Sequence, residues 1–188
     1  MTSNKTVFFI IGTLLIILGL FMLIPYGVQI FYKEESHSFL SSSFVTILIG
    51  TLFVLANLQK EYQLNLKQTF LFSTFAWIAI AGFGALPFML SDINFSISDS
   101  FFESMSGITT TGSTVVTDLD SSPKSILMWR AIMQWLGGVG IIVMAITVLP
   151  LLKVGGMQLF KIESSDKPEK ILPRTSQVAF IIISTYLI

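Results

Sequence analysis

Four long runs of apolar residues constrain this chain more than any other feature, because each run is long enough to cross a lipid bilayer. The runs cover residues 7–32, 39–58, 69–90 and 125–152. At 1.5 Å per helical residue, the first run reaches about 39 Å and crosses a hydrocarbon core of about 30 Å with tilt. A fifth run opens after Pro173 and extends to the last residue. We therefore expect the chain to be part of a longer protein.

Composition supports a membrane protein and excludes several other classes. Of the 188 residues, 53% are hydrophobic and only 12% are charged, which is typical of an integral membrane protein. The net charge is zero, so there is no basic face for a nucleic-acid partner. No cysteine is present, which excludes disulfides, thiolate metal sites and cysteine nucleophiles. The fold class predicted is all-α and integral to the membrane, with the lipid bilayer as its first partner.

The distribution of basic residues between the apolar runs predicts the orientation of the chain in the membrane. One side would carry Lys5, Lys60, Lys67, Lys153, Lys161, Lys167, Lys170 and Arg174, whereas the other carries Lys33 and Lys124. Because lysine and arginine gather on the cytoplasmic side, the N-terminus is predicted to be cytoplasmic. The first run is too long for the apolar part of a secretory signal, so we interpret it as a retained helix.

The segment between the third and fourth runs is polar and too short to span. Residues 98–108, "SDSFFESMSGI", predict a helix of about 16 Å with Ser98 as its N-cap, near half of the hydrocarbon core. Residues 109–116 are β-branched and favour an extended chain, which returns about the same distance in five residues. A re-entrant hairpin is one interpretation, because such backbone is tolerated where it lines a water-filled cavity. The alternative is an exposed loop of small residues.

As a hairpin, this segment has the chemistry of a cation filter. Backbone carbonyls outside a helix or sheet can replace the hydration shell of a cation. Glycine lets the backbone approach the ion closely, and threonine stiffens the chain on either side. The carboxyl end of the short helix carries partial negative charge, which favours a cation over an anion.

Other residues of this region are candidates for support. Glu103 and Arg130 both lie among apolar residues, so we expect an ion pair that braces the hairpin against the fourth run, or else two side chains that reach the interface. Three glycines of the fourth run, Gly137, Gly138 and Gly140, permit close packing or bending. Packing is the commoner role of glycine in membrane helices.

These residues resemble the Trk/Ktr/HKT superfamily of potassium transporters, and within it the bacterial TrkH/TrkG branch. The matching segments are "GALPFML", "DSFFESMSGITTTGST", "MWRAIMQWLGGVGIIVMAITVLPLLKVGGMQLFKIESSD" and "PRTSQVA", in that order. The resemblance implies four helix–pore-loop–helix repeats around one potassium-channel-like pore, preceded by two additional helices. It implies that Thr109, Thr110, Thr111 and Gly112 supply filter oxygens, with Thr110 and Thr111 as the main potassium ligands.

The same resemblance predicts an organisation for the whole chain. Residues 1–66 would form the two additional helices, 67–152 the first repeat, 153–173 a cytoplasmic connection and 174–188 the start of a second repeat. The complete protein would be a homodimer in the bacterial inner membrane, regulated by a cytosolic nucleotide-binding subunit of RCK type, TrkA-like. The basic residues of the connection suit that subunit, although they also follow from membrane orientation alone.

Potassium uptake, with one of four filter segments supplied by this chain, is the function predicted. The alternative is a secondary transporter that binds another monovalent cation or a small solute through a re-entrant loop. No nucleophile, metal-ligand set or paired acids at one depth are apparent, so we expect neither an enzyme nor an organic cofactor.

Overall fold

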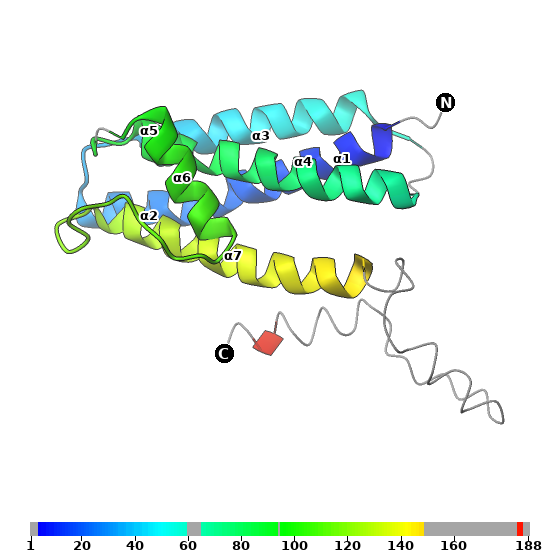
Figure 1. Ribbon diagram of the computed structural model, residues 1–188. Coiled ribbons are helices and arrows are strands. Elements are labelled where there is room, and N and C mark those ends of the chain that lie inside the picture. The colour runs from blue at the N-terminus through cyan, green and yellow to red at the C-terminus, as the bar shows by residue number, and fades with distance from the viewer. Residues whose placement is uncertain (1–3, 60–64, 94, 149–183, 186–188) are drawn as a thin grey trace, which may run out of the picture. The chain divides into compact units, whose positions relative to one another are not determined.

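The computed structural model describes residues 4–59, 65–93, 95–148 and 184–185. The chain divides into two compact units, Met1–Gly137 and Gly138–Ile188, and all contacts discussed below lie within the first. The helices, which Figure 1 labels, are α1 (Lys5–Phe21), α2 (Leu23–Tyr32), α3 (Ser38–Ala56), α4 (Leu66–Gly84), α5 (Leu86–Leu90), α6 (Ile97–Ile108) and α7 (Lys124–Val148). Within the described ranges, all regular secondary structure is helical, as predicted.

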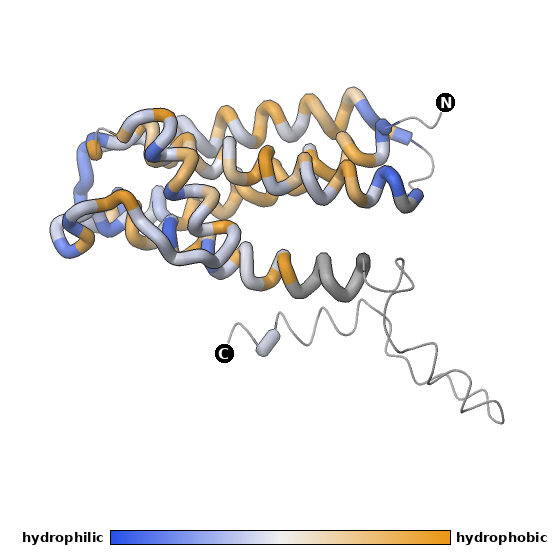
Figure 2. Tube along the Cα trace, viewed as in Figure 1, coloured by the Kyte–Doolittle hydropathy of each residue, from blue (hydrophilic) through white to orange (hydrophobic). Residues whose placement is uncertain are grey.

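Three stretches of the described chain are long and apolar enough to cross a membrane: Lys5–Tyr32, Ser38–Ala56 and Lys67–Leu90. They coincide with the first three predicted runs. Hydrophobic residues follow the long helices, and hydrophilic residues gather at helix ends and in loops (Figure 2). The predicted fourth run forms α7, a helix of 25 residues that is not among the three. Its predicted end at Leu152, and the predicted segments 153–173 and 174–188, lie outside the described residues, apart from Ser184 and Thr185.

Proline breaks two of these stretches at positions that follow from its chemistry. A proline lacks the N–H that bonds the carbonyl four residues earlier, and its ring clashes with that carbonyl. Pro25 stands four residues after Phe21, where α1 ends, and α2 resumes after Met22. Pro87 likewise stands just inside α5, two residues beyond the break at Ala85. Lys5–Tyr32 and Lys67–Leu90 are therefore each two helical pieces in sequence.

The helices α1 and α3 pack closely because glycines face each other across their contact. A Cβ on Gly12 would lie 2.7 Å from the carbonyl oxygen of Gly50, and a Cβ on Gly50 would lie 2.8 Å from that of Gly12. Farther along, the Ser43 hydroxyl donates to the carbonyl of Gly19 at 2.7 Å. Small residues let two backbones approach in a membrane protein, where van der Waals packing drives helix association.

The short helix α6 crosses between the longer helices rather than running alongside them (Figure 1). It packs on α4 and α5. The chain enters α6 and leaves the following loop at one end of the bundle, where α5 ends and α7 begins (Figure 1). At that end the indole N–H of buried Trp129 in α7 donates to the carbonyl of Gly84, the last residue of α4, at 2.9 Å. This bond satisfies a carbonyl at the end of the broken helix.

Candidate functional site: the hairpin formed by α6 and residues 109–116

The helix α6 begins two residues earlier than the sequence predicted. Its N-cap is Ser96, whose hydroxyl accepts a hydrogen bond from the N–H of Asp99, while the Asp99 carboxylate accepts from the N–H of Ser96. This reciprocal pair is a capping box. Ser98, the predicted N-cap, therefore lies inside the first turn of α6. Asp99 stands three residues after Ser96, which is the spacing that a capping box requires. The carboxylate there also suits the positive end of the helix dipole.

A tight turn follows α6 at Thr109 and Thr110. The Thr110 N–H donates to the carbonyl of Gly107 at 2.9 Å, and the Thr111 N–H donates to that of Ser106 at 3.0 Å. Thr110 has φ of 57°, a left-handed conformation that costs a non-glycine residue about 1–2 kcal/mol. The sequence predicted an extended chain from Thr109 onward, whereas the returning segment starts only at Thr111. The two bonds explain the difference, because they cap the free carbonyls of the last helical turn.

The returning segment, residues 111–116, is fastened to α6 by side chains of that helix. The hydroxyl of buried Ser106 donates to the carbonyl of Ser113 at 2.6 Å. The carboxylate of Glu103 accepts from the Thr114 hydroxyl and from the Val115 N–H, each at 3.0 Å. The chain thus folds back along the helix it has just left, and polar contacts hold the two together.

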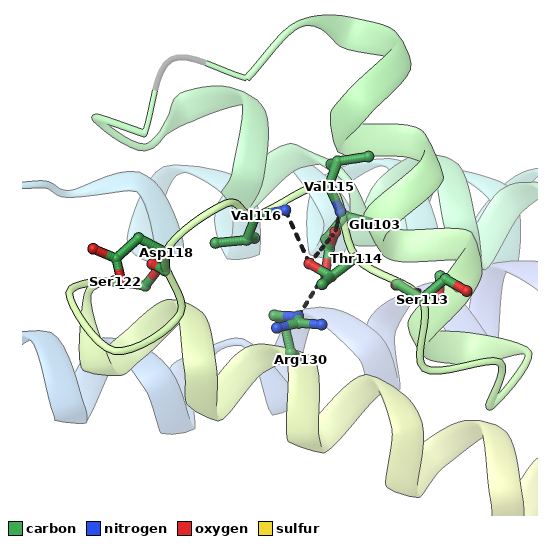
Figure 3. A network of polar contacts seen from close by, with 9 residues as sticks. Glu103, Ser113, Thr114, Val115, Val116, Asp118, Ser122 and Arg130 are labelled. Atoms are coloured by element: carbon green, nitrogen blue, oxygen red, sulfur yellow. Dashed lines mark hydrogen bonds and ion pairs between the residues drawn. The ribbon is translucent and has the colours of Figure 1, made fainter.

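Glu103 also joins the hairpin to α7. Its second carboxylate oxygen pairs with Nε of Arg130 at 2.5 Å, and the Glu103 side chain is only 1% exposed (Figure 3). The structure thus brings together the two charged residues that the sequence singled out. A carboxylate with an arginine on one oxygen and two hydrogen-bond donors on the other is satisfied despite its burial. Removing either partner would leave an uncompensated charge.

The four predicted filter residues form the tip of the hairpin. Thr110, Thr111 and Gly112 are exposed, and Thr109 is partly buried. Gly112 has φ of 77°, so its missing side chain is required by the backbone. The hydroxyls of Thr109 and Thr111 lie 2.8 Å apart. Within the described part of the chain, the carbonyls of Thr109 to Gly112 accept no hydrogen bond.

The three candidate glycines of α7 differ in their surroundings. A Cβ on Gly137 would lie 1.9 Å from the carbonyl oxygen of Ile108, the last residue of α6. Gly137 is therefore a close-packing position beneath the tip of the hairpin. Gly140 has open space, with no atom of the described residues within 4 Å of an added Cβ. Gly138 lies at the start of the second unit.

Sequence reasoning missed three contacts of this region. Neither Ser106 nor Thr114 was a candidate, although both fasten the returning segment. The bond between Trp129 and Gly84 was also unforeseen. Serine and threonine are common near any loop, so no signal in the sequence separates those that reach back to the helix from those that face solvent.

Long apolar helices, a helix too short to span and a braced returning segment together define the class: a helical membrane protein with an irregular segment held between its helices. Comparison with known proteins is specific about the type. The family described as "TrkH: Cation transport protein" matches residues 35–188. The chain belongs to this TrkH family, which confirms the resemblance seen in the sequence. The family is described as one of transport proteins rather than enzymes, in agreement with the prediction.

Individual relatives agree with the family. The chain is 40% identical over 178 residues to "Trk system potassium uptake protein TrkI" of Halomonas elongata, covering 94% of this chain and 36% of the relative. It is also 40% identical over 174 residues to "Trk system potassium uptake protein TrkH" of Escherichia coli strain K12, covering 90% and 36%. The crystal structure of the potassium transporter TrkH from Vibrio parahaemolyticus superposes with a TM-score of 0.84 at 34% identity, covering 99% of this chain and 37% of that one. The chain thus spans little more than a third of the length of these relatives.

Proposed function

We propose that the hairpin is one of four filter segments of a potassium uptake protein, and that potassium crosses the membrane against the carbonyls of Thr109 to Gly112. The observation that carries the proposal is that these four carbonyls accept no hydrogen bond within the described residues, although the backbone on both sides is held in place. Uncommitted, fixed carbonyls are what a dehydrating cation needs. The TrkI and TrkH relatives carry potassium uptake in their names.

Charge also favours a cation at the tip. The helix α6 ends at Ile108, directly before Thr109 to Gly112. Its carboxyl end places partial negative charge next to these residues. The positive charge of Arg130 is offset by Glu103, so it does not oppose a cation. Within this proposal, Thr110 and Thr111 are the main potassium ligands, and the Thr109 hydroxyl, which donates to the carbonyl of Met105 at 2.7 Å, helps to hold the turn.

The proposal extends to the complete protein. One hairpin supplies a quarter of a ring, and the other three come from further repeats. Residues 67–152 would be the first repeat, with residues 1–66 as two additional helices and a cytoplasmic N-terminus in the bacterial inner membrane. The complete protein would form a homodimer and bind a TrkA-like nucleotide-binding subunit at residues 153–173. The alternative, a secondary transporter with a discontinuous helix, is less well supported, because the hairpin begins and ends at one end of the bundle (Figure 1).

Rubidium and sodium uptake in cells without their own potassium uptake systems tests the proposal. The complete protein is compared with its Gly112→Ser variant. Gly112 has φ of 77°, and a side chain there costs about 1–2 kcal/mol, a factor of about ten in an equilibrium. We expect rubidium uptake to be lost or sodium to enter. Gly27→Ser is the matched control, because nothing lies within 4 Å of a Cβ at Gly27. Unchanged uptake in Gly112→Ser would remove the hairpin tip from the ion path.

A further inference from the structure

A carboxylate from the loop between α2 and α3 binds the start of α7. The carboxylate of Glu34 accepts hydrogen bonds from both the hydroxyl and the backbone N–H of Ser125, the latter at 3.2 Å. Ser125 lies in the first turn of α7, where backbone N–H groups have no partner within the helix. Negative charge is favourable at this end of a helix. Glu34 therefore serves α7 as a cap from a point 91 residues earlier in the chain.

The backbone at the end of α2 fixes the place of Glu34. Lys33 adopts a left-handed conformation, with φ of 54°, and ends the helix. The Lys33 N–H donates to the carbonyl of Ile30, and the Glu34 N–H donates to that of Gln29 at 3.0 Å. This pattern closes a helix C-terminus and leaves little freedom in the residue that follows. The backbone of Glu34 is thus fixed by hydrogen bonds to the end of α2.

Aromatic contacts also join the helices α1 and α3 to α7. Phe39, in the first turn of α3, packs edge-on against Trp129 with ring centroids 6.0 Å apart, and both side chains are fully buried. Phe21, at the end of α1, packs against Trp135 at 5.9 Å. Together with Glu34 and Ser125, these contacts set where α7 begins and how it is rotated about its axis.

The same part of α7 contains Arg130, which is the residue that pairs with the hairpin. Arg130 stands five residues after Ser125, about 7.5 Å along the helix. It pairs with Glu103, which in turn holds Thr114 and Val115 of the returning segment. A displacement of the start of α7 therefore moves Arg130, and with it the carboxylate that positions the segment next to Gly112. Groups that bind a ligand must be held within about 0.5 Å of their working geometry.

We propose that Glu34 is a positioning residue for ion selectivity: through Ser125 it sets the height of α7, and so the geometry of the hairpin tip. This inference rests on the proposed function of the hairpin. It gives the two N-terminal helices a role beyond anchoring the protein in lipid, since their connecting loop would help to fix the filter. The residue itself does not touch the ion.

The test measures ion selectivity and the amount of protein separately. The complete protein, Glu34→Ala and Ser125→Ala are expressed in cells lacking their own potassium uptake systems, and rubidium and sodium uptake are divided by membrane abundance. We expect the rubidium-to-sodium ratio to fall several-fold in both variants at unchanged abundance. The double variant should show no more than the larger single effect, because both changes act on the same contact. Glu35→Ala is the matched control, being the exposed acidic neighbour in the same loop, and it should keep the parental ratio.

Three results would overturn the inference: an unchanged ratio, a parallel fall in both fluxes, or a fall in abundance alone. Ser125→Ala decides the matter if Glu34→Ala does not accumulate, since it removes only one hydroxyl. The parental protein separates this inference from the function it rests on. A parent without selective uptake contradicts the proposed function, whereas a selective parent with unchanged variants contradicts only the role of Glu34.

Discussion

The contact between α1 and α3 and the contact between the hairpin and α7 join helices by opposite means. In the first, Gly12 and Gly50 bring two backbones together. In the second, the buried carboxylate of Glu103 binds an arginine of α7 and a hydroxyl and a backbone N–H of the returning segment. The contact between α1 and α3 requires that no side chain stand at Gly12 and Gly50. The hairpin instead requires charged and hydrogen-bonding partners.

This difference follows from what each region has to hold. Two regular helices satisfy their own backbone hydrogen bonds, so only shape remains to be matched. The returning segment has no regular secondary structure from Thr111 to Val116. Its backbone groups need partners from elsewhere, and side chains of α6 provide them for the carbonyl of Ser113 and the N–H of Val115. Irregular backbone is therefore fixed by polar contacts that are few and individually important.

The largest effect should come from breaking the charge pair. Glu103→Ala leaves Arg130 without its partner and also removes the acceptor for Thr114 and Val115. Removal of one partner of a buried pair costs about 3–5 kcal/mol. We expect a large fall in the apparent melting temperature of the purified protein, and an equal or smaller fall for Arg130→Ala. The double variant should lose much less than the sum of the two, because no lone charge remains buried. Additive losses would show that the two residues stabilise the protein independently.

A smaller effect should come from adding one methyl group to the helix pair. Gly12→Ala places a Cβ within 2.7 Å of a backbone oxygen of Gly50, and overpacking of this kind costs about 1–3 kcal/mol. Gly27→Ala is the control, since it lies in α2 with nothing within 4 Å, and alanine there favours the helix by up to about 1 kcal/mol. Thermal unfolding of the purified protein measures both. A Gly12→Ala variant as stable as the parent would mean that the helices separate without cost.

The smallest effect should come from a single hydrogen bond within the hairpin. Ser106→Ala removes the donor to the carbonyl of Ser113, a loss of about 1 kcal/mol. We expect faster hydrogen exchange at Val115 and Val116, whose N–H groups bond to Glu103 and Thr114, with little change in melting temperature. Ser113→Ala keeps its carbonyl and therefore its bond to Ser106, so it should exchange like the parent. Equal exchange in both variants would remove Ser106 from the fastening of the segment.

Much of the helical frame could be predicted from the sequence, because hydropathy and proline act locally. The run at 39–58 became Ser38–Ala56, and the run at 69–90 became Leu66–Leu90 with its break. Pro25 accounts for the interruption of the first run. The short helix was also foreseen, though Ser98 was chosen as its cap in place of Ser96, which has its capping-box partner Asp99 three residues later.

What escaped prediction depends on contacts between distant residues or on unusual backbone. Glu34 and Ser125 lie 91 positions apart and carry no motif that links them. Positive φ is uncommon outside glycine, yet Lys33 and Thr110 adopt it because hydrogen bonds at the ends of α2 and α6 require that turn. Glu103 and Arg130 were foreseen as a pair because charge among apolar residues is costly. The uncharged polar residues of the hairpin have no comparable cost of burial, so their contacts cannot be predicted from the sequence in the same way.

The facing glycines of α1 and α3 also restrict how this protein can change over generations. A Cβ on either residue meets the backbone oxygen of the other, at 2.7 or 2.8 Å. Trimming a neighbouring side chain cannot relieve a clash with main chain, so neither position has a simple compensating partner. Descendants that enlarge one glycine must move a whole helix. Each of the two sites is therefore held at glycine, and a lineage should leave this state only through changes along the contact that move the two helices apart.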